Sequence, residues 1–210
     1  MDSAKQVQGV QTGTTTVGMI CKDGVILASD RRATMGYLIA SKDIDKIYAI
    51  NDRIAMTIAG SVGDAQTLVR WMTAEVKLYE LKHERQINVE AAATLLGNIL
   101  AQHKFFPFFV QLLIGGLDEK PRLFSVDMLG GMTEEKVTAT GSGSPIAYGV
   151  LEEMYTEDSN ISATLPVAAK AVSAAMKRDA ASGERVDLVV ITKYGVKRMN
   201  KEDVQKLLNA

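Results

Sequence analysis

The apolar residues of this chain follow two periods, and each period persists through a long block of sequence. Strand-like runs rich in β-branched residues fill residues 14–59, helical stripes fill 60–106, strand-like runs return over 109–140, helical stripes return over 144–181, and strand-like runs then resume. Such blocks, rather than strict alternation of strand and helix, are typical of α+β proteins with antiparallel sheets. We therefore expect an α+β fold.

Several of the strand-like runs are apolar on both faces, which indicates sheets that are buried on both sides. The first two runs flank Lys22-Asp23-Gly24, a hairpin turn with Asp-Gly at its centre. The simplest arrangement stacks two antiparallel sheets and covers each outer face with helices. The expected strands are 14–21, 24–30, 46–51, 53–59, 109–117, 121–127, 136–140, 186–192 and 196–199.

Residues that favour helix ends mark the helical stripes. The predicted helix starts are Ser61 with Asp64 in the spacing of a capping box, Asn88 as an N-cap, and Ser144 with Pro145 at N-cap and N1. The predicted ends are near Glu84, before Pro107, and before Gly183 for a fourth helix over residues 165–181. A short helix is expected at the end of the chain.

Composition excludes several function classes. The 24 basic and 25 acidic residues leave a net charge of −1, which gives no electrostatic reason to expect a nucleic acid or an anionic membrane as partner. Residues 1–13 lack the apolar stretch of a secretion signal, and the most apolar segment, 105–117, is too short to cross a bilayer. Cys21 is the only cysteine, so it forms no internal disulfide. These observations predict a single-domain, soluble protein of the cytoplasm.

The sequence also disfavours the commonest catalytic and cofactor sites. His83 and His103 both fall in predicted helices, without the spacing of a metal site or of a serine–histidine–acid triad. The glycine-rich "TGSGSP" at 140–145 precedes a helix and so suits an anion, but no lysine follows it in the Walker pattern. A tight capping turn is the alternative interpretation. We expect neither a metal nor a cofactor.

Three places could carry chemistry or could be purely structural. The consecutive residues Thr14, Thr15 and Thr16 suit a strand, although one hydroxyl could be a reagent. The segment 57–64 passes from strand to helix through glycine, which leaves backbone N–H groups free for an oxyanion. A buried lysine beside a carboxylate has a perturbed proton affinity, and Asp30 and Lys46 each flank an apolar run; surface charge is the plainer alternative for both.

Taken together, these segments resemble one family closely. The motifs are "GTTTVG", "LASDRRATMG", "MTIAGSVGDAQ", "LLIGGLD", "ATGSGSPIAYGVLE" and "RDAASGERVDLVVIT", and they cover nearly the whole chain. Their joint spacing resembles that of proteasome β subunits of the archaeal type, which are threonine proteases among the N-terminal-nucleophile hydrolases. The resemblance implies a four-layer α-β-β-α sandwich, in which two antiparallel sheets are flanked by helices.

The resemblance also implies a self-cleaving precursor. Family members cut themselves between a glycine and a threonine, which here are Gly13 and Thr14. Residues 1–13 would be a propeptide, and residues 14–210 a single catalytic domain. The Thr14 hydroxyl would attack the scissile carbonyl, and its freed α-amine, with an ordinary pKa of about 7.7–8.0, would take part in proton transfer. An internal threonine has no such amine, so the precursor would be inactive toward other substrates.

The other site residues are carried over from the family motifs. Lys46, held by Asp30, would help to take the threonine proton, and the division of this work with the amine stays open. The backbone N–H of Gly60 would be the oxyanion donor. The hydroxyls and carboxylate that surround the nucleophile and orient its amine would come from Ser142, Asp179 and Ser182, while Thr15 and Thr16 would remain strand residues. Arg32 matches a neighbouring structural position. The substrate pocket would be lined by Ala33, Thr34, Ile58 and Val62, and its small and aliphatic members favour cleavage after hydrophobic residues.

The family assembles into large particles. The resemblance implies seven-membered rings of β subunits, flanked by rings of proteasome α subunits, and a regulatory ATPase ring that feeds unfolded polypeptide through the α rings. Two other functions remain as alternatives: a non-catalytic ring subunit, which would lack the set Thr14, Asp30 and Lys46, and an amidase of the same fold that acts on a small molecule.

Overall fold

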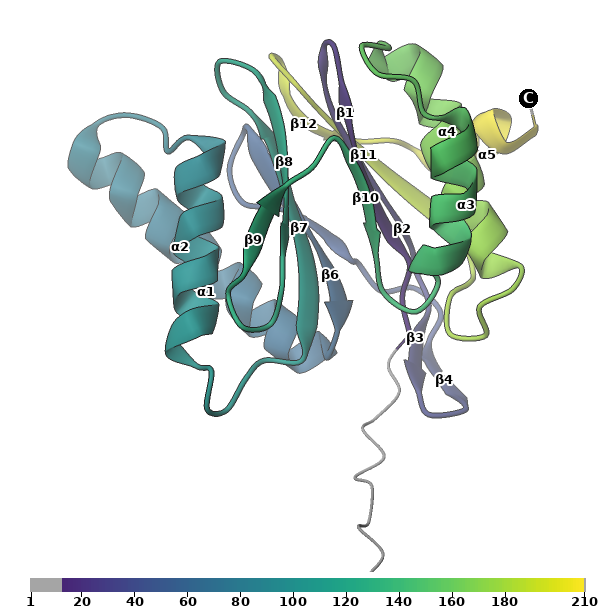
Figure 1. Cartoon of the computed structure of the whole chain (residues 1–210), viewed down its shortest axis with the longest axis horizontal. Coiled ribbons are helices and arrows are strands. Elements are labelled where there is room, and N and C mark those ends of the chain that lie inside the picture. Colours follow the sequence, from purple (N-terminus) through teal and green to yellow (C-terminus); the bar gives the residue numbers. More distant parts are fainter. Residues whose placement is uncertain (1–12, 210) are drawn as a thin grey trace, which may run out of the picture.

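A computed structural model describes residues 13–209, in which strands and helices follow one another in the block order that the apolar periods predict (Figure 1). Within these residues the helices are α1 (Val62–His83), α2 (Val89–Gln102), α3 (Ser144–Met154), α4 (Ile161–Met176) and α5 (Lys201–Asn209). Residues 1–12 of the predicted propeptide lie outside the described part of the chain.

The strands form two five-stranded antiparallel sheets and one separate hairpin. The first sheet has the order β10 (Val137–Thr140), β1 (Thr16–Cys21), β2 (Gly24–Asp30), β11 (Val186–Thr192) and β12 (Gly195–Arg198). The second has the order β5 (Ile47–Ala49), β6 (Ile54–Gly60), β7 (Val110–Leu117), β8 (Pro121–Val126) and β9 (Met132–Glu134). The hairpin pairs β3 (Ala33–Met35) with β4 (Leu38–Ser41). These antiparallel sheets and their helices confirm the α+β class.

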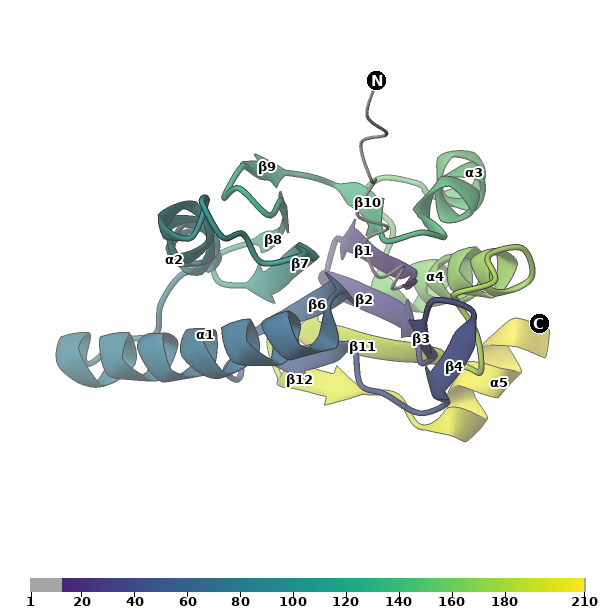
Figure 2. The same ribbon diagram turned by 90° about the horizontal axis from the view of Figure 1, so that it is seen from below.

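Three hydrophobic clusters hold the elements together. One packs α1 and α2 on the second sheet, and another packs α3, α4 and α5 on the first sheet. The third cluster joins the two sheets, with Leu27 of β2 and Leu113 of β7 among its members. Strand β2 serves two clusters because its side chains alternate: Ile26 and Ala28 face the helices, whereas Val25 and Leu27 face the second sheet. Figures 1 and 2 show α1 and α2 on one side of the molecule and α3 and α4 on the other.

The predicted helix starts at Ser61 and Asn88 are confirmed. The side chain of Ser61 accepts a hydrogen bond from Asp64 N, and that of Asn88 accepts one from Ala91 N. Each N-cap therefore satisfies an N–H group in the first turn that has no partner within the helix.

The start of the third helix was predicted one residue late. Its N-cap is Gly143, which has no side chain that could accept a hydrogen bond, and Ser144 is already helical. Pro145 still lies in the first turn, where its missing N–H costs nothing.

The fourth helix was misplaced at both ends. It begins after Asn160, whose side chain accepts from Ala163 N, so Ile161 rather than Leu165 starts it. It ends at Met176, and the following residues form turns in which the Asp179 carboxylate accepts from Ala181 N and the Ser182 hydroxyl. These local hydrogen bonds replace the helical ones expected up to residue 181.

Three strands were not predicted at all, namely β3, β4 and β9. Each has three or four residues, too few to establish a period of two. The expected strand over 14–21 is also shorter, since β1 begins at Thr16. Thr15 was predicted to be a strand residue and is not one, because its N–H donates to the Asp30 side chain instead of a ladder partner.

Candidate active site

Thr14 lies just before β1 and is almost completely buried, with 4% of its surface exposed. Its hydroxyl donates a hydrogen bond of 2.6 Å to the Gly13 carbonyl oxygen, and its backbone N–H donates to the Ser142 hydroxyl at 3.2 Å. The hydroxyl thus lies against the carbonyl group of the peptide bond that the family motif predicts to be cut.

Gly13 fits its position only because it has no side chain. A Cβ atom there would lie 1.6 Å from the Ala181 Cβ and 3.0 Å from the Ser142 Oγ. The first of these separations is far shorter than any real contact between carbon atoms. The turn after α4 therefore presses on the residue before Thr14 and requires glycine.

Asp30, the last residue of β2, is fully buried and accepts four hydrogen bonds. Its Oδ1 accepts from Thr15 N at 3.0 Å and from Lys46 Nζ at 2.7 Å. Its Oδ2 accepts from Arg32 N at 3.0 Å and from Gly183 N at 2.9 Å. A carboxylate has about four lone-pair sites, and here each accepts one hydrogen bond, so the buried charge is fully solvated by protein groups. The four donors also tie Asp30 to four positions along the chain.

Lys46 lies directly before β5 and is 4% exposed. Burial disfavours its charged form and lowers its pKa below the ordinary value for lysine, although the neighbouring Asp30 carboxylate acts in the opposite direction. A lysine with a lowered pKa is neutral more often near pH 7 than a surface lysine. It is therefore better suited to accept a proton.

Ser142, Asp179 and Ser182 are joined around Thr14 by short hydrogen bonds. The hydroxyls of Ser142 and Ser182 each donate to Asp179 Oδ2 at 2.6 Å. Ser182 Oγ is 2.7 Å from Thr15 Oγ1, and Ser142 receives the N–H of Thr14. The structure thus brings these three predicted residues together on the side of the Thr14 nitrogen.

Gly60 ends β6 immediately before Ser61, the N-cap of α1. It has a φ of +116°, and a Cβ there would lie 2.1 Å from the Phe109 carbonyl oxygen, so this position also requires glycine. Ile58 N donates to Lys46 O, and alternate N–H groups of a strand point to the same side. The N–H of Gly60 is therefore directed to the edge of β6 at which Lys46 lies.

The predicted pocket residues lie on three elements. Ala33 and Thr34 belong to β3, Ile58 belongs to β6, and Val62 is the first residue of α1. The Thr34 hydroxyl accepts a hydrogen bond of 3.2 Å from Gly13 N, so β3 lies beside the Gly13–Thr14 bond. For all four residues the pocket role stays a prediction.

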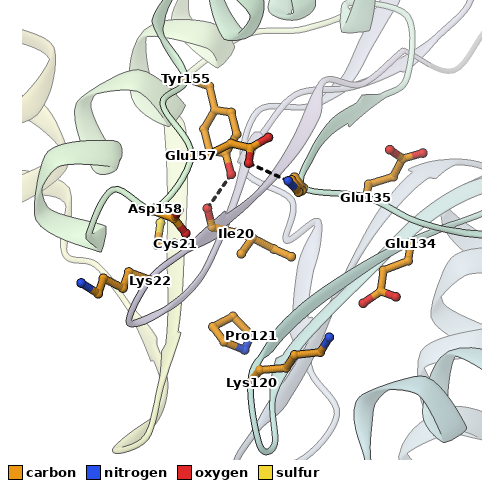
Figure 3. A pocket seen from close by; sticks show the side chains of 11 residues that line it. Ile20, Cys21, Lys22, Lys120, Pro121, Glu134, Glu135, Tyr155, Glu157 and Asp158 are labelled. Atoms are coloured by element: carbon orange, nitrogen blue, oxygen red, sulfur yellow. Dashed lines mark hydrogen bonds and ion pairs between the residues drawn. The ribbon is translucent and has the colours of Figure 1, made fainter.

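A cavity of about 520 Å³ lies elsewhere and contains none of the predicted site residues (Figure 3). Its lining includes Ile20, Cys21 and Tyr155, and the Tyr155 hydroxyl donates to the Ile20 carbonyl. Cys21 is the end of β1 opposite to Thr16, roughly 17 Å away by the rise of a strand. Burial raises the pKa of Cys21 to about 11, so this thiol stays protonated and is a poor nucleophile.

Each histidine contacts a backbone carbonyl at the end of a helix, His83 as the last residue of α1 and His103 as the C-cap of α2. His83 Nδ1 lies 2.9 Å from Tyr79 O, and His103 Nδ1 lies 2.8 Å from Ile99 O. Over residues 13–209, no three His, Cys, Asp or Glu side chains gather as a metal site would require. Every helix that the structure describes is too short or too polar to span a bilayer.

The sequence reasoning missed residues that surround the site. Arg31 lies next to Asp30 and forms ion pairs with Asp43, Asp45 and Asp187, and its partners are 12 to 156 residues away in the chain. Nothing in the local pattern indicates such pairing. The acidic residues at 43 and 45 on either side of Ile44 are the nearest available hint.

Comparison with known proteins gives matches over nearly the whole chain. A family model described as "Proteasome subunit" matches residues 10–191. A protein named proteasome subunit beta from Archaeoglobus profundus is 53% identical over 203 residues, which are 96% of this chain and 94% of that protein. Proteins of the same name from Methanocaldococcus fervens and Methanosarcina barkeri are 56% and 49% identical, covering 95% and 99% of this chain and 91% and 97% of theirs.

Proposed function

This chain belongs to the proteasome family, and from that membership we infer that it is a catalytic β subunit of the 20S core particle. It is a threonine-type endopeptidase that hydrolyses peptide bonds, and it assembles with other proteasome subunits. We further propose that its sheets and helices form the four-layer α-β-β-α sandwich of N-terminal-nucleophile hydrolases. The three hydrophobic clusters, two under helices and one between the sheets, support this arrangement.

The single observation that carries the proposed mechanism is the position of the Thr14 hydroxyl, 2.6 Å from the Gly13 carbonyl oxygen. In the precursor, Thr14 Oγ attacks the carbonyl carbon of Gly13 and gives its proton to Lys46. The carbon–nitrogen bond then breaks, the Thr14 nitrogen gains a proton, and an ester joins Gly13 to Thr14 Oγ. Water hydrolyses this ester, which releases residues 1–13 as an acid and leaves Thr14 with a free amine.

The mature subunit applies the same steps to other chains. Thr14 Oγ attacks the scissile carbonyl, the Gly60 N–H stabilises the oxyanion, and the resulting acyl-enzyme is hydrolysed. Ser142, Asp179 and Ser182 orient the amine, since the Thr14 nitrogen already donates to Ser142 in the uncut chain. Each of these roles uses protein groups alone, and the proposal includes no cofactor.

The processing step predicts a definite loss of mass. After co-assembly with α subunits, the intact mass of the subunit, measured by mass spectrometry, is expected to decrease by the mass of residues 1–13. An active particle whose β subunit keeps its full mass would contradict cleavage at Gly13. Gly13→Ala is the matched test of geometry, because the added Cβ meets Ala181 while the hydroxyl, lysine and aspartate are unchanged. This variant is expected to remain largely unprocessed.

We propose that the pocket for the residue before the cut is formed by Ala33, Thr34, Ile58 and Val62. A small residue and two aliphatic ones favour apolar side chains, so kcat/KM for fluorogenic peptides is expected to be highest when that residue is hydrophobic. The control peptides differ only at that residue and carry a basic or an acidic side chain. Faster cleavage of either control would overturn this assignment.

The assembled form follows the family pattern in our proposal. Seven β subunits form a ring, two such rings stack and are flanked by α rings, and a regulatory ATPase delivers unfolded polypeptide through the α rings. Proteins named proteasome subunit beta align with 96% and 99% of this chain, and the extent of this similarity supports the proposal.

A further inference from the structure

The segment that carries Lys46 is irregular, yet many contacts hold it. Residues 42–46 lie between β4 and β5 and belong to no strand. Two hydrogen bonds to other backbone groups hold it: Ile44 N donates to Arg31 O at 3.0 Å, and Lys46 O accepts from Ile58 N at 2.9 Å. Side chains must therefore supply the rest of the rigidity.

Arg31, which directly follows β2, and Arg198 of β12 both bind this segment. Arg31, whose side chain is 7% exposed, pairs with Asp43 and with Asp45 at 2.6 Å. Arg198 of β12 pairs with Asp45, and its second nitrogen donates to the Ile47 carbonyl at 2.7 Å. Asp45 is thus held by both side chains, and the carbonyl after Lys46 by Arg198, while Asp43 also pairs with Arg185 at 2.7 Å.

A buried carboxylate joins the two arginines. Asp187 of β11, 7% exposed, lies 3.0 Å from Arg31 and 2.7 Å from Arg198. Burial alone would lower the pKa of Arg31, but hydrogen bonds to Asp45 and Asp43 raise it above the ordinary value, so the cluster stays charged. Networks with alternating charges and several shared partners are worth more than isolated surface pairs.

We propose that Arg31 and Arg198 are positioning residues that hold the segment 43–47 against the first sheet and thereby keep Lys46 in hydrogen-bonding contact with Asp30. This inference rests on the proposed role of Lys46 in proton transfer. Neither arginine acts on the substrate: both act through the backbone and acidic side chains on either side of Lys46. The charged groups that influence Lys46 directly are Asp30, Asp179 and Arg32, from the ends of β2 and α4.

The test is the pH dependence of peptide hydrolysis by the assembled particle carrying Arg198→Gln. Arg198 is 39% exposed, and Arg31 continues to neutralise Asp187 in this variant, so the fold is retained. A looser segment admits water around Lys46 and raises its pKa, which moves the acidic limb of the pH–rate profile to higher pH. We expect kcat to fall by about 10- to 100-fold with KM nearly unchanged, because a small misplacement of a catalytic group has such an effect.

Arg122→Gln is the matched control. Arg122 pairs with Glu90 and Glu134 and is 17% exposed, so the substitution removes a comparable network elsewhere in the molecule. Both variants are expected to lose some stability, but only Arg198→Gln should shift the profile. Arg198→Lys should restore it in part, since lysine cannot contact all of Asp45, Asp187 and the Ile47 carbonyl in the geometry of a guanidinium.

Asp45→Asn tests the same idea from the segment itself. Asp45 is 48% exposed, and its loss leaves Asp187 paired with both arginines, so no buried charge is stranded. It should shift the acidic limb in the same direction as Arg198→Gln. If both variants keep the wild-type profile, the inference is wrong while the proposed function stands. If the wild-type particle shows no Thr14-dependent hydrolysis, the proposed function itself has failed.

Discussion

Peptide hydrolysis is expected to fall by at least about 10⁴-fold when Thr14→Ala is expressed with residues 1–13 already removed. The reason is that this substitution removes the hydroxyl that we propose as the nucleophile. The substitution removes only a hydroxyl and a methyl group, and the amine and its contact with Ser142 remain. The measurement is the steady-state rate of hydrolysis of a fluorogenic peptide by purified, assembled particles at equal concentration.

Thr14→Ser is the matched control, because it keeps the hydroxyl and the α-amine and removes only a methyl group. It should hydrolyse the same peptide at a rate much nearer to that of the unchanged chain. Persistent hydrolysis by the alanine variant, at a rate close to wild type, would mean that the nucleophile has been assigned to the wrong residue.

Lys46→Met is expected to lower kcat by roughly 10²- to 10⁴-fold, the usual contribution of a general base. The methionine preserves much of the lysine volume but accepts no proton and gives Asp30 no hydrogen bond. In the unchanged chain the rate should rise with pH through the pKa of Lys46, which burial lowers, so that rise comes at lower pH than for an ordinary lysine. In the methionine variant this limb of the pH–rate profile should disappear.

Stability separates the chemical role of Lys46 from its structural one. Removing the lysine leaves Asp30 buried without its cation, which typically costs about 3–5 kcal/mol of unfolding free energy. The double variant Asp30→Asn with Lys46→Met removes both charges, but its amide NH2 must face at least one backbone N–H donor, so it should regain only a small part of that stability and no activity. Recovery of hydrolysis in the double variant would show that the lysine serves only to neutralise the aspartate.

Local patterns were sufficient to predict most of the fold. The capping residues Ser61 and Asn88 act within three residues of themselves, and the long amphipathic stripes of α1 and α2 need no tertiary context. The hairpin β3–β4 was not predicted because strands of three and four residues establish no period. The end of α4 was missed because the Asp179 side chain accepts from Ala181 N, a backbone donor that a longer helix would use.

The candidate site was accessible to sequence reasoning only through the family motifs. Asp30 and Lys46 are 16 residues apart; Asp30 ends β2 in one sheet and Lys46 directly precedes β5 in the other, so neither spacing nor period predicts that they meet. The resemblance supplied the pair, and the structure supplied what no motif contains, namely the donors Thr15, Arg32 and Gly183 around Asp30. The charged network of Arg31 was missed for the same physical reason, since its partner Asp187 is distant in the chain.

The hydrogen bonds of Asp30 also determine how early during synthesis the site can form. Its last donor, Gly183, follows it by 153 residues, so a nascent chain still emerging from the ribosome cannot complete this carboxylate's surroundings until synthesis is nearly finished. The self-cutting that we propose at Gly13 would therefore be delayed without any external inhibitor. A polypeptide interrupted early in translation can carry Thr14 and all of β1 and yet, on this proposal, cannot become a stray protease.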